Sequence, residues 1–315
     1  MKKYFALLLL LLPMLLTGCY DKWDYAGCPV DDNFELRFTL TGEGGGDLFA
    51  GKIDKVDVVL FDQDGDFVLH KSVLREDLGP QNSIRLTVDP GTYYVVALGN
   101  IGSYSTISTL AKGASIADSY VEVTSNETGG PHYYAPAQNE LTRALDGNTD
   151  HSEYKVVLPP GEVVEKELNF VRAHRTVNVY VKGLGNLPAY GGTQARVELT
   201  NIPCKYDFYR RTAAVRKNYV RTTQDTETNA GSMVKTSFSA PICSFADDMN
   251  IYLRSTADGT QLIDPICLKT WVEQNTPEYL NEFDVLITIT KQGDTVKVDV
   301  TLPDWEAIGV DPGDL

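Results

Sequence analysis

Apolar and polar residues alternate along much of this chain, and that period of two constrains its fold more than any other feature of the sequence. Residues 34–40 (FELRFTL) show it most simply, because every second side chain is apolar, as in a strand with one buried face. A similar alternation, or a short continuous apolar run, predicts further strands at 52–61, 67–69, 84–88, 93–98, 177–181, 195–199, 283–289 and 296–302.

Turn sequences separate these segments. Asp64-Gly65 follows the second predicted strand, and residues 291–294 (KQGD) connect the last two. Helical periodicity is confined to two short pieces, 105–111 and 114–120. The pattern is therefore typical of an all-β fold whose apolar faces pack as β-sandwiches.

The length of 315 residues favours two domains, and Pro159-Pro160-Gly161 provides a linker or turn near the middle of the chain. We expect two β-sandwich domains in tandem, an N-terminal one at residues 31–160 and a C-terminal one at residues 161–315. The residues before them have a different composition and a different expected role.

The start of the chain has the features of an export signal. Two lysines precede an apolar run at 5–16, which is shorter than the ~20 residues of a helix that spans a bilayer. Leu16-Thr17-Gly18-Cys19 follows and resembles a bacterial lipobox, in which cleavage separates Gly18 from Cys19 and the thiol receives lipid. We expect residues 1–18 to be a lipoprotein signal peptide and residues 19–30 a lipidated tether. The alternative is a plain signal peptide that leaves Cys19 unmodified.

The chain carries a formal charge of −15, and loss of the signal peptide would remove two lysines and no acidic residue. A protein with this net negative charge is repelled by the phosphate backbone of nucleic acids. We therefore expect no nucleic-acid partner. Lipid on Cys19 is then the expected link to the outer membrane. Asp21 and Asp24 follow this cysteine and resemble a surface-export signal, so we expect a surface-exposed position.

The sequence contains no pattern that indicates catalysis or metal binding. The four histidines lie far apart, and the acidic run 62–66 (DQDGD) lacks the glycine and glutamate that an EF-hand needs at its sixth and twelfth positions. We therefore expect a hairpin turn at 62–66, no enzyme, no metal and no cofactor. The remaining cysteines permit three disulfide pairings or free thiols, and these alternatives stay open: Cys28, Cys204, Cys243 and Cys267.

Aromatic residues gather at Tyr133-Tyr134 and at 206–209 (YDFY). Such side chains can stack on sugar rings or on a protein partner, but tyrosine is also an ordinary strand residue. We favour the structural interpretation and keep the binding interpretation as an alternative.

The order of several short motifs resembles a known family. The motifs, in chain order, are Cys19, Cys28-Pro29, the segment 34–40, the hairpin 56–65, Pro90-Gly91-Thr92-Tyr93, Leu98-Gly99-Asn100, the segment 168–172 (LNFVR), the hairpin 283–300 and Trp305. Across residues 19–306 this order resembles the FimB-like minor fimbrial subunits of Bacteroidia, lipoproteins that anchor a fimbrium to the outer membrane.

The resemblance implies two tandem transthyretin-like β-sandwiches and a non-enzymatic protein at the fimbrium base. Such a protein holds the fimbrial shaft at the cell surface and limits its length. The implied partners are fimbrial shaft subunits and, through lipid on Cys19, the outer membrane. The alternative function is a surface glycan-binding lipoprotein of a polysaccharide-uptake system, with a glycan as its ligand.

The resemblance also implies that shaft subunits lose an N-terminal strand to a protease, which opens a groove for a strand donated by a neighbour. Here the segment 34–40 begins fifteen residues after Cys19, so cleavage beyond it would separate the body from its lipid. We expect this strand to remain and the shaft to bind an exposed sheet edge or loop. The residues after Leu302 include Pro312 and Gly313 and make a poor donor strand, so we expect the chain to end a polymer.

Overall fold

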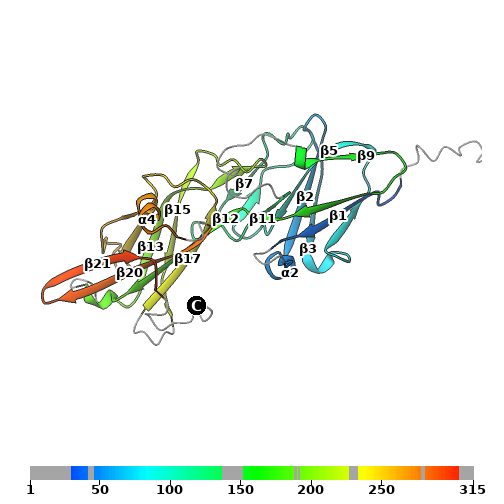
Figure 1. Cartoon of the computed structure of the whole chain (residues 1–315). Coiled ribbons are helices and arrows are strands. Elements are labelled where there is room, and N and C mark those ends of the chain that lie inside the picture. Colours follow the sequence, from blue (N-terminus) through cyan, green and yellow to red (C-terminus); the bar gives the residue numbers. More distant parts are fainter. Residues whose placement is uncertain are drawn as a thin grey trace, which may run out of the picture.

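The computed structural model describes residues 30–41, 46–136, 152–187, 190, 192–226, 233–277 and 281–304. Strands dominate these residues, and the helices among them are few and short (Figure 1). The molecule is elongated, with β1 (Phe34–Thr39) and β9 (Lys155–Leu158) toward one end and the hairpin of β20 (Glu282–Gln292) and β21 (Thr295–Thr301) at the other. The expected all-β class is confirmed.

Two sheets form the N-terminal half. The smaller has the strand order β10-β1-β4, and the larger has the order β11-β8-β5-β2-β3, with β9 also paired to β5. The other strands are β2 (Lys55–Asp62), β3 (Phe67–Leu74), β4 (Ser83–Leu86), β5 (Gly91–Gly99), β8 (Tyr133–Ala135), β10 (Val164–Asn169) and β11 (Val171–Arg172). Short helical turns lie between strands at α2 (Phe49–Lys52), η3 (Arg75–Asp77) and η4 (Ser152–Tyr154).

Apolar side chains from both sheets fill the space between them. Phe34, Leu36 and Phe38 of β1 are fully buried and share one cluster with Val58 of β2 and Val95 of β5. Full burial of each such side chain contributes about 1.5–3 kcal/mol. The alternation in the sequence therefore corresponds to one buried face of a sandwich, as expected.

The strand β1 lies in the centre of the smaller sheet. Phe34 is opposite Val164 of β10 in a parallel pair and opposite Leu86 of β4 in an antiparallel pair. Loss of β1 would leave both neighbours with an unpaired edge and would open the core to water.

A third sheet covers the other face of the larger sheet. It consists of β6 (Ser105–Ile107), β7 (Tyr120–Val123) and β14 (Lys205–Asp207), in the order β14-β7-β6. Phe61 of β2 shares a buried cluster with Tyr206 and Phe208. Because β14 follows strands of the C-terminal half, this sheet joins the two halves through backbone hydrogen bonds and a common core.

The C-terminal half contains two further sheets around a core of its own. Their strand orders are β16-β17-β12-β20-β21 and β15-β13-β18-β19. The central strand β12 is parallel to β20 and antiparallel to β17, as β1 is to β10 and β4. The remaining elements are β12 (His174–Lys182), η5 (Leu184–Asn186), β13 (Ala195–Pro203), β15 (Arg216–Thr222), β16 (Gln224–Thr226), β17 (Met233–Pro241), β18 (Asn250–Ser255), β19 (Ile266–Cys267) and α4 (Leu268–Asn275).

The two predicted helical pieces, 105–111 and 114–120, are wrong. Residues 105–107 form β6, whose pairing with β7 outweighs the weak local period. In the second piece the Ser115 hydroxyl donates to Asp118 and accepts from its amide, so side-chain hydrogen bonds favour a turn over a helix. The helix α4 was not expected; it buries Leu268 and Trp271 in the C-terminal core.

The boundary expected at 160/161 lies on a turn between two strands of the same half. The strand β10 follows that turn and pairs along its whole length with β1. Residues 164–169 therefore belong with the N-terminal sheets, because their backbone hydrogen bonds and the buried Leu168 complete that half. Two domains remain a proposal, with a division that lies after β10.

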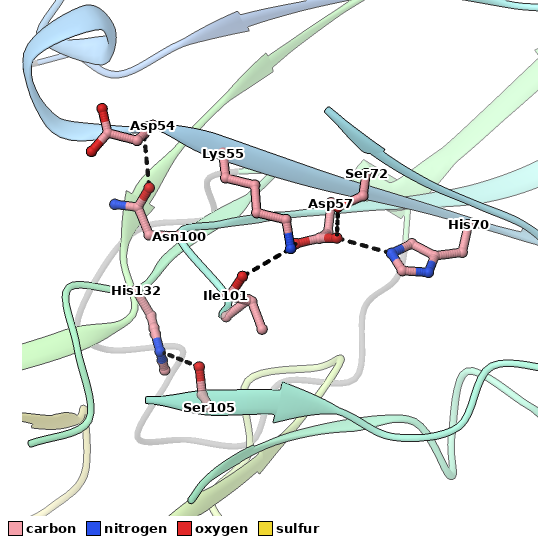
Figure 2. Close-up of polar contacts among 9 residues, drawn as sticks. All are labelled: Asp54, Lys55, Asp57, His70, Ser72, Asn100, Ile101, Ser105 and His132. Carbon is pink, nitrogen blue, oxygen red and sulfur yellow. Dashed lines mark hydrogen bonds and ion pairs between the residues drawn. The ribbon is translucent and has the colours of Figure 1, made fainter. Parts of the chain in front are cut away.

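Two buried histidines lie where the halves meet. His132 hydrogen-bonds Ser105 Oγ at 2.7 Å (Figure 2), and His174 Nδ1 donates to the His132 carbonyl at 2.7 Å. Burial lowers the pKa of His132 to about 3 and that of His174 to about 4. Both side chains are therefore neutral in the folded protein at neutral pH.

This burial predicts acid sensitivity. In the unfolded chain each histidine takes up a proton below about pH 6.5, whereas in the folded chain it stays neutral. The free energy of unfolding should therefore fall between about pH 6.5 and about pH 4, by about 1.4 kcal/mol per pH unit for each histidine. Urea unfolding at a series of pH values measures the slope. His174→Asn keeps a donor near the Nδ1 position and should make the slope shallower; an unchanged slope would contradict the prediction.

Candidate functional site

The N-terminal sandwich is open along one side, where the edge strands of its two sheets face each other. A groove of about 700 Å³ lies there, between β3 and β4. The turn at residues 77–81 and two side chains of β1, Glu35 and Arg37, also line it. The groove is therefore bounded by two sheet edges and is open to a partner.

The β3 edge offers the longer backbone surface. It has eight residues, and no described strand pairs with it on the side away from β2. The β4 edge has four residues, and Ser83 is already hydrogen-bonded to Gly79 through both backbone groups. On this side the Phe67 amide donates to the Ala114 carbonyl, and the rest of the edge is a template for an added strand.

A network of charged residues lies beside the groove. Glu35 accepts hydrogen bonds from Arg37 Nε at 3.0 Å and from Arg85 Nε at 2.9 Å. The hydrogen bond from Arg37, followed by that from Arg85, holds the pKa of Glu35 below its usual value against the effect of burial. Lys71 of β3 and Asp77 line the groove as well, and Arg37 also pairs with Glu165 of β10 at 3.0 Å. Charges of the two signs therefore balance around the groove, whereas the protein as a whole is acidic.

A buried carboxylate fixes β3 to β2 just behind this edge (Figure 2). Asp57 is 1% exposed, and its Oδ1 accepts hydrogen bonds from Ser72 Oγ at 2.6 Å and His70 Nε2 at 3.0 Å. Lys55 Nζ lies 3.0 Å from Oδ2 and also donates to the Ile101 carbonyl. Burial raises the pKa of Asp57, but the hydrogen bonds from His70 and Ser72 outweigh it and the pKa is below its usual value.

This cluster has the residue types of a catalytic triad without its arrangement. The serine and the histidine both hydrogen-bond the same oxygen of Asp57, so the histidine is not placed between nucleophile and acid. Ser72 lies directly opposite Asp57 in the β2–β3 register. The cluster therefore clamps two strands together and positions the edge that forms the groove.

The structure separates the residues singled out in the sequence. Gly18, Cys19, Cys28 and the residues after Asp304 lie outside the described residues. Cys204, Cys243 and Cys267 are free thiols. In the described part of the chain no group of histidine, cysteine or acidic residues could hold a metal ion. None of its helices has the length and hydropathy of a membrane span.

The aromatic candidates are mostly structural. Tyr133, Tyr134, Tyr206 and Phe208 are all buried, and the Tyr134 hydroxyl donates to the Phe208 carbonyl. Tyr209 is partly exposed. The acidic run 62–66 is the hairpin turn between β2 and β3, as expected. Sequence reasoning missed Asp57, although an acidic residue within the apolar run 56–61 was a usable signal.

Removal of the Asp57 charge should weaken the β2–β3 pairing. Asp57→Asn keeps the size of the side chain but loses the charge that pairs with Lys55 and weakens the acceptor that His70 and Ser72 share. We expect unfolding to require about 1–3 kcal/mol less, measured by urea denaturation. Asp54→Asn is the matched control, because Asp54 is 83% exposed and its ion pair with Arg75 should contribute less than about 1 kcal/mol. Equal losses in the two variants would contradict the clamp.

Solved structures share this fold. A candidate adhesin from Bacteroides ovatus has a TM-score of 0.63 at 17% identity, over 86% of this chain and 94% of that one. Another from Bacteroides thetaiotaomicron has a TM-score of 0.59 at 16% identity, over 85% and 95%. The fimbrial anchor protein Mfa2 from Porphyromonas gingivalis has a TM-score of 0.56 at 14% identity, over 85% and 96%.

The sequence comparisons agree with the expected resemblance. No curated protein matches this chain. The family described as fimbrillin-A associated anchor proteins Mfa1 and Mfa2 matches residues 25–311, so the expected relation to fimbrium-anchoring subunits is confirmed. This is a family of fimbrial structural proteins and not a class of enzymes. Since the match spans most of its sequence, the chain belongs to the fimbrillin-A associated anchor proteins.

Proposed function

We propose that this chain is an outer-membrane lipoprotein at the base of a fimbrium, which binds a shaft subunit and limits the length of the shaft. The observation that carries this proposal is the central position of β1 between β10 and β4. If shaft subunits lose the corresponding strand and receive a donated one, a subunit with β1 in place has no room for the donor. Growth of the polymer then stops at this subunit.

The lipid supplies the attachment to the membrane. Ten residues lie between Cys19 and Val30, where the described chain begins, and a fully extended segment from one to the other spans at most about 40 Å. The N-terminal sandwich would therefore stay within that reach of the outer membrane. Acyl chains on Cys19 contribute about 0.8 kcal/mol for each buried CH₂ group, so two or three chains give stable anchoring.

The groove between β3 and β4 is the surface that we assign to the shaft. Its long unpaired edge suits an extended segment that adds a strand to the larger sheet. Lys71, for which the described residues supply no ion pair, favours a segment with acidic side chains, whereas Arg37 and Arg85 are already paired with Glu35. The partner would thus be an extended, acidic segment of a shaft subunit. The chain itself would have no catalytic part in this task.

Charge reversal in the groove tests the assignment. Lys71→Glu should weaken retention of the shaft and make it more sensitive to salt, because charges at the rim of an interface act mainly on association. Lys297→Glu on β21 is the matched control, since it makes the same charge change on an exposed edge strand far from the groove. The measurement compares fimbriae retained on cells with fimbriae released into the medium.

A cross-linking experiment gives an independent result. A photoreactive side chain at position 71 should form a covalent adduct with a shaft subunit, and the same group at position 297 should not. Adducts at both positions, or at 297 alone, would contradict binding at the groove. An equal loss of fimbrial retention in Lys71→Glu and Lys297→Glu would also contradict binding at the groove.

A further inference from the structure

A second hollow lies on the N-terminal half and shares no residue with the groove. Its volume is about 230 Å³. The β2–β3 turn at Gln63, Asp64 and Gly65 forms one side, and Tyr94 of β5 and Tyr209 contribute aromatic rings. We propose that this pocket binds a single neutral sugar ring, a function separate from the anchoring of a shaft.

The frame of the pocket is fixed on the side of the β2–β3 turn. Asp62 Oδ1 accepts hydrogen bonds from the amides of Asp64 and Asp66, both at 2.9 Å. Gly65 has φ +86°, and a Cβ there would lie 3.2 Å from Ile116 Cγ2, so the turn packs closely against the pocket floor. A turn held in this way presents its side chains without a large ordering cost when a ligand binds.

The opposite side is fixed by a second carboxylate. Asp207 Oδ1 accepts hydrogen bonds from the amides of Tyr209 and Arg211, at 2.9 and 2.8 Å. The guanidinium of Arg211 is 2.6 Å from the other oxygen of Asp207 and 5.0 Å from the centre of the Tyr209 ring. The Tyr209 ring is therefore held in place from its own loop.

The lining matches the two kinds of surface on a sugar. Tyr94, Tyr209 and the buried Ile116 offer apolar and aromatic surface to the C–H face of a ring. Gln63 and Asp64 are exposed, and within the described residues their side chains have no hydrogen-bond partner. The amide can donate and accept and the carboxylate can accept, which suits sugar hydroxyls.

The volume of the pocket and the charges around it limit the class of ligand. The volume is smaller than the roughly 300–1,000 Å³ of sites for drug-sized molecules, so one ring fits and a longer chain must extend into solvent. Asp62, Asp64 and Asp66 make the turn acidic, and Arg211, the cation beside the Tyr209 ring, is already paired with Asp207. The pocket should therefore prefer a neutral sugar to a uronic acid or another acidic sugar.

Saturation-transfer NMR on the full mature chain tests the proposal. The probes are the methyl glycosides of glucose, galactose, mannose and N-acetylglucosamine, and glucuronic acid is the acidic sugar for comparison. At least one neutral glycoside should receive saturation on its ring C–H protons, and glucuronic acid should bind less. Tyr209→Ala should weaken binding at least tenfold. Tyr104→Ala, which removes a 43% exposed tyrosine outside the pocket, should leave it unchanged.

A second variant covers the case in which Tyr209→Ala fails to fold. Ala117→Gln places a larger neutral side chain on the exposed rim and should block the pocket without a change in the core. Oligosaccharides from host mucin and from bacterial capsule then distinguish the source of the sugar, and binding of either supports the site. The proposal fails if no neutral glycoside binds, if glucuronic acid binds best, or if Ala117→Gln and Tyr104→Ala behave alike.

Discussion

The pairing of β1 with β10 on one side and β4 on the other is the interaction on which the rest of the structure depends. Its apolar face fills the N-terminal core, and its polar face carries the Glu35 ion pairs beside the groove. The parallel partner lies far along the chain, since Thr39 is opposite Asn169. The N-terminal half therefore closes only after most of its residues have been placed, which is a contact of high sequence separation.

The halves are joined by a buried contact and not by a free linker. The strand β14 pairs with β7, and Tyr206 and Phe208 pack into the cluster that covers the larger N-terminal sheet. An extensive apolar contact of this kind disfavours independent motion of the two parts. It also explains why Tyr209 can complete a pocket whose other walls come from the N-terminal half.

The alternation in the sequence predicted many of the strands, because the period of two reports burial on one face, but β15, β17 and β18 were not expected. It did not predict strand order, since the pairing of residues 34–39 with 164–169 depends on contacts that no local window contains. The helix prediction for residues 105–111 and 114–120 failed for a similar reason. Strand pairing with β7 and the hydrogen bonds between Ser115 and Asp118 decide the conformation there. The pattern in Leu268–Asn275 is too short to stand out before its burial is known.

The candidate sites were accessible from the sequence only in part. The sequence that resembles a lipobox at Cys19 is a local motif, so lipid attachment there could be proposed without a structure. The groove could not, because Lys71 and Arg85 come together only when the edges of two sheets face each other. Likewise, Tyr209 lay within a recognised aromatic run, but its neighbour Tyr94 is on a strand more than a hundred residues earlier.

The N-terminus of the mature protein tests the central claim most directly, because the claim requires β1 and the lipid on one continuous chain. Protein recovered from intact cells can be digested and its N-terminal peptide identified by mass spectrometry. We expect a chain that begins at a lipid-modified Cys19 and retains residues 34–39. A mature chain that begins after Arg37 or later would contradict the claim, since β1 would be cut and the body separated from its anchor.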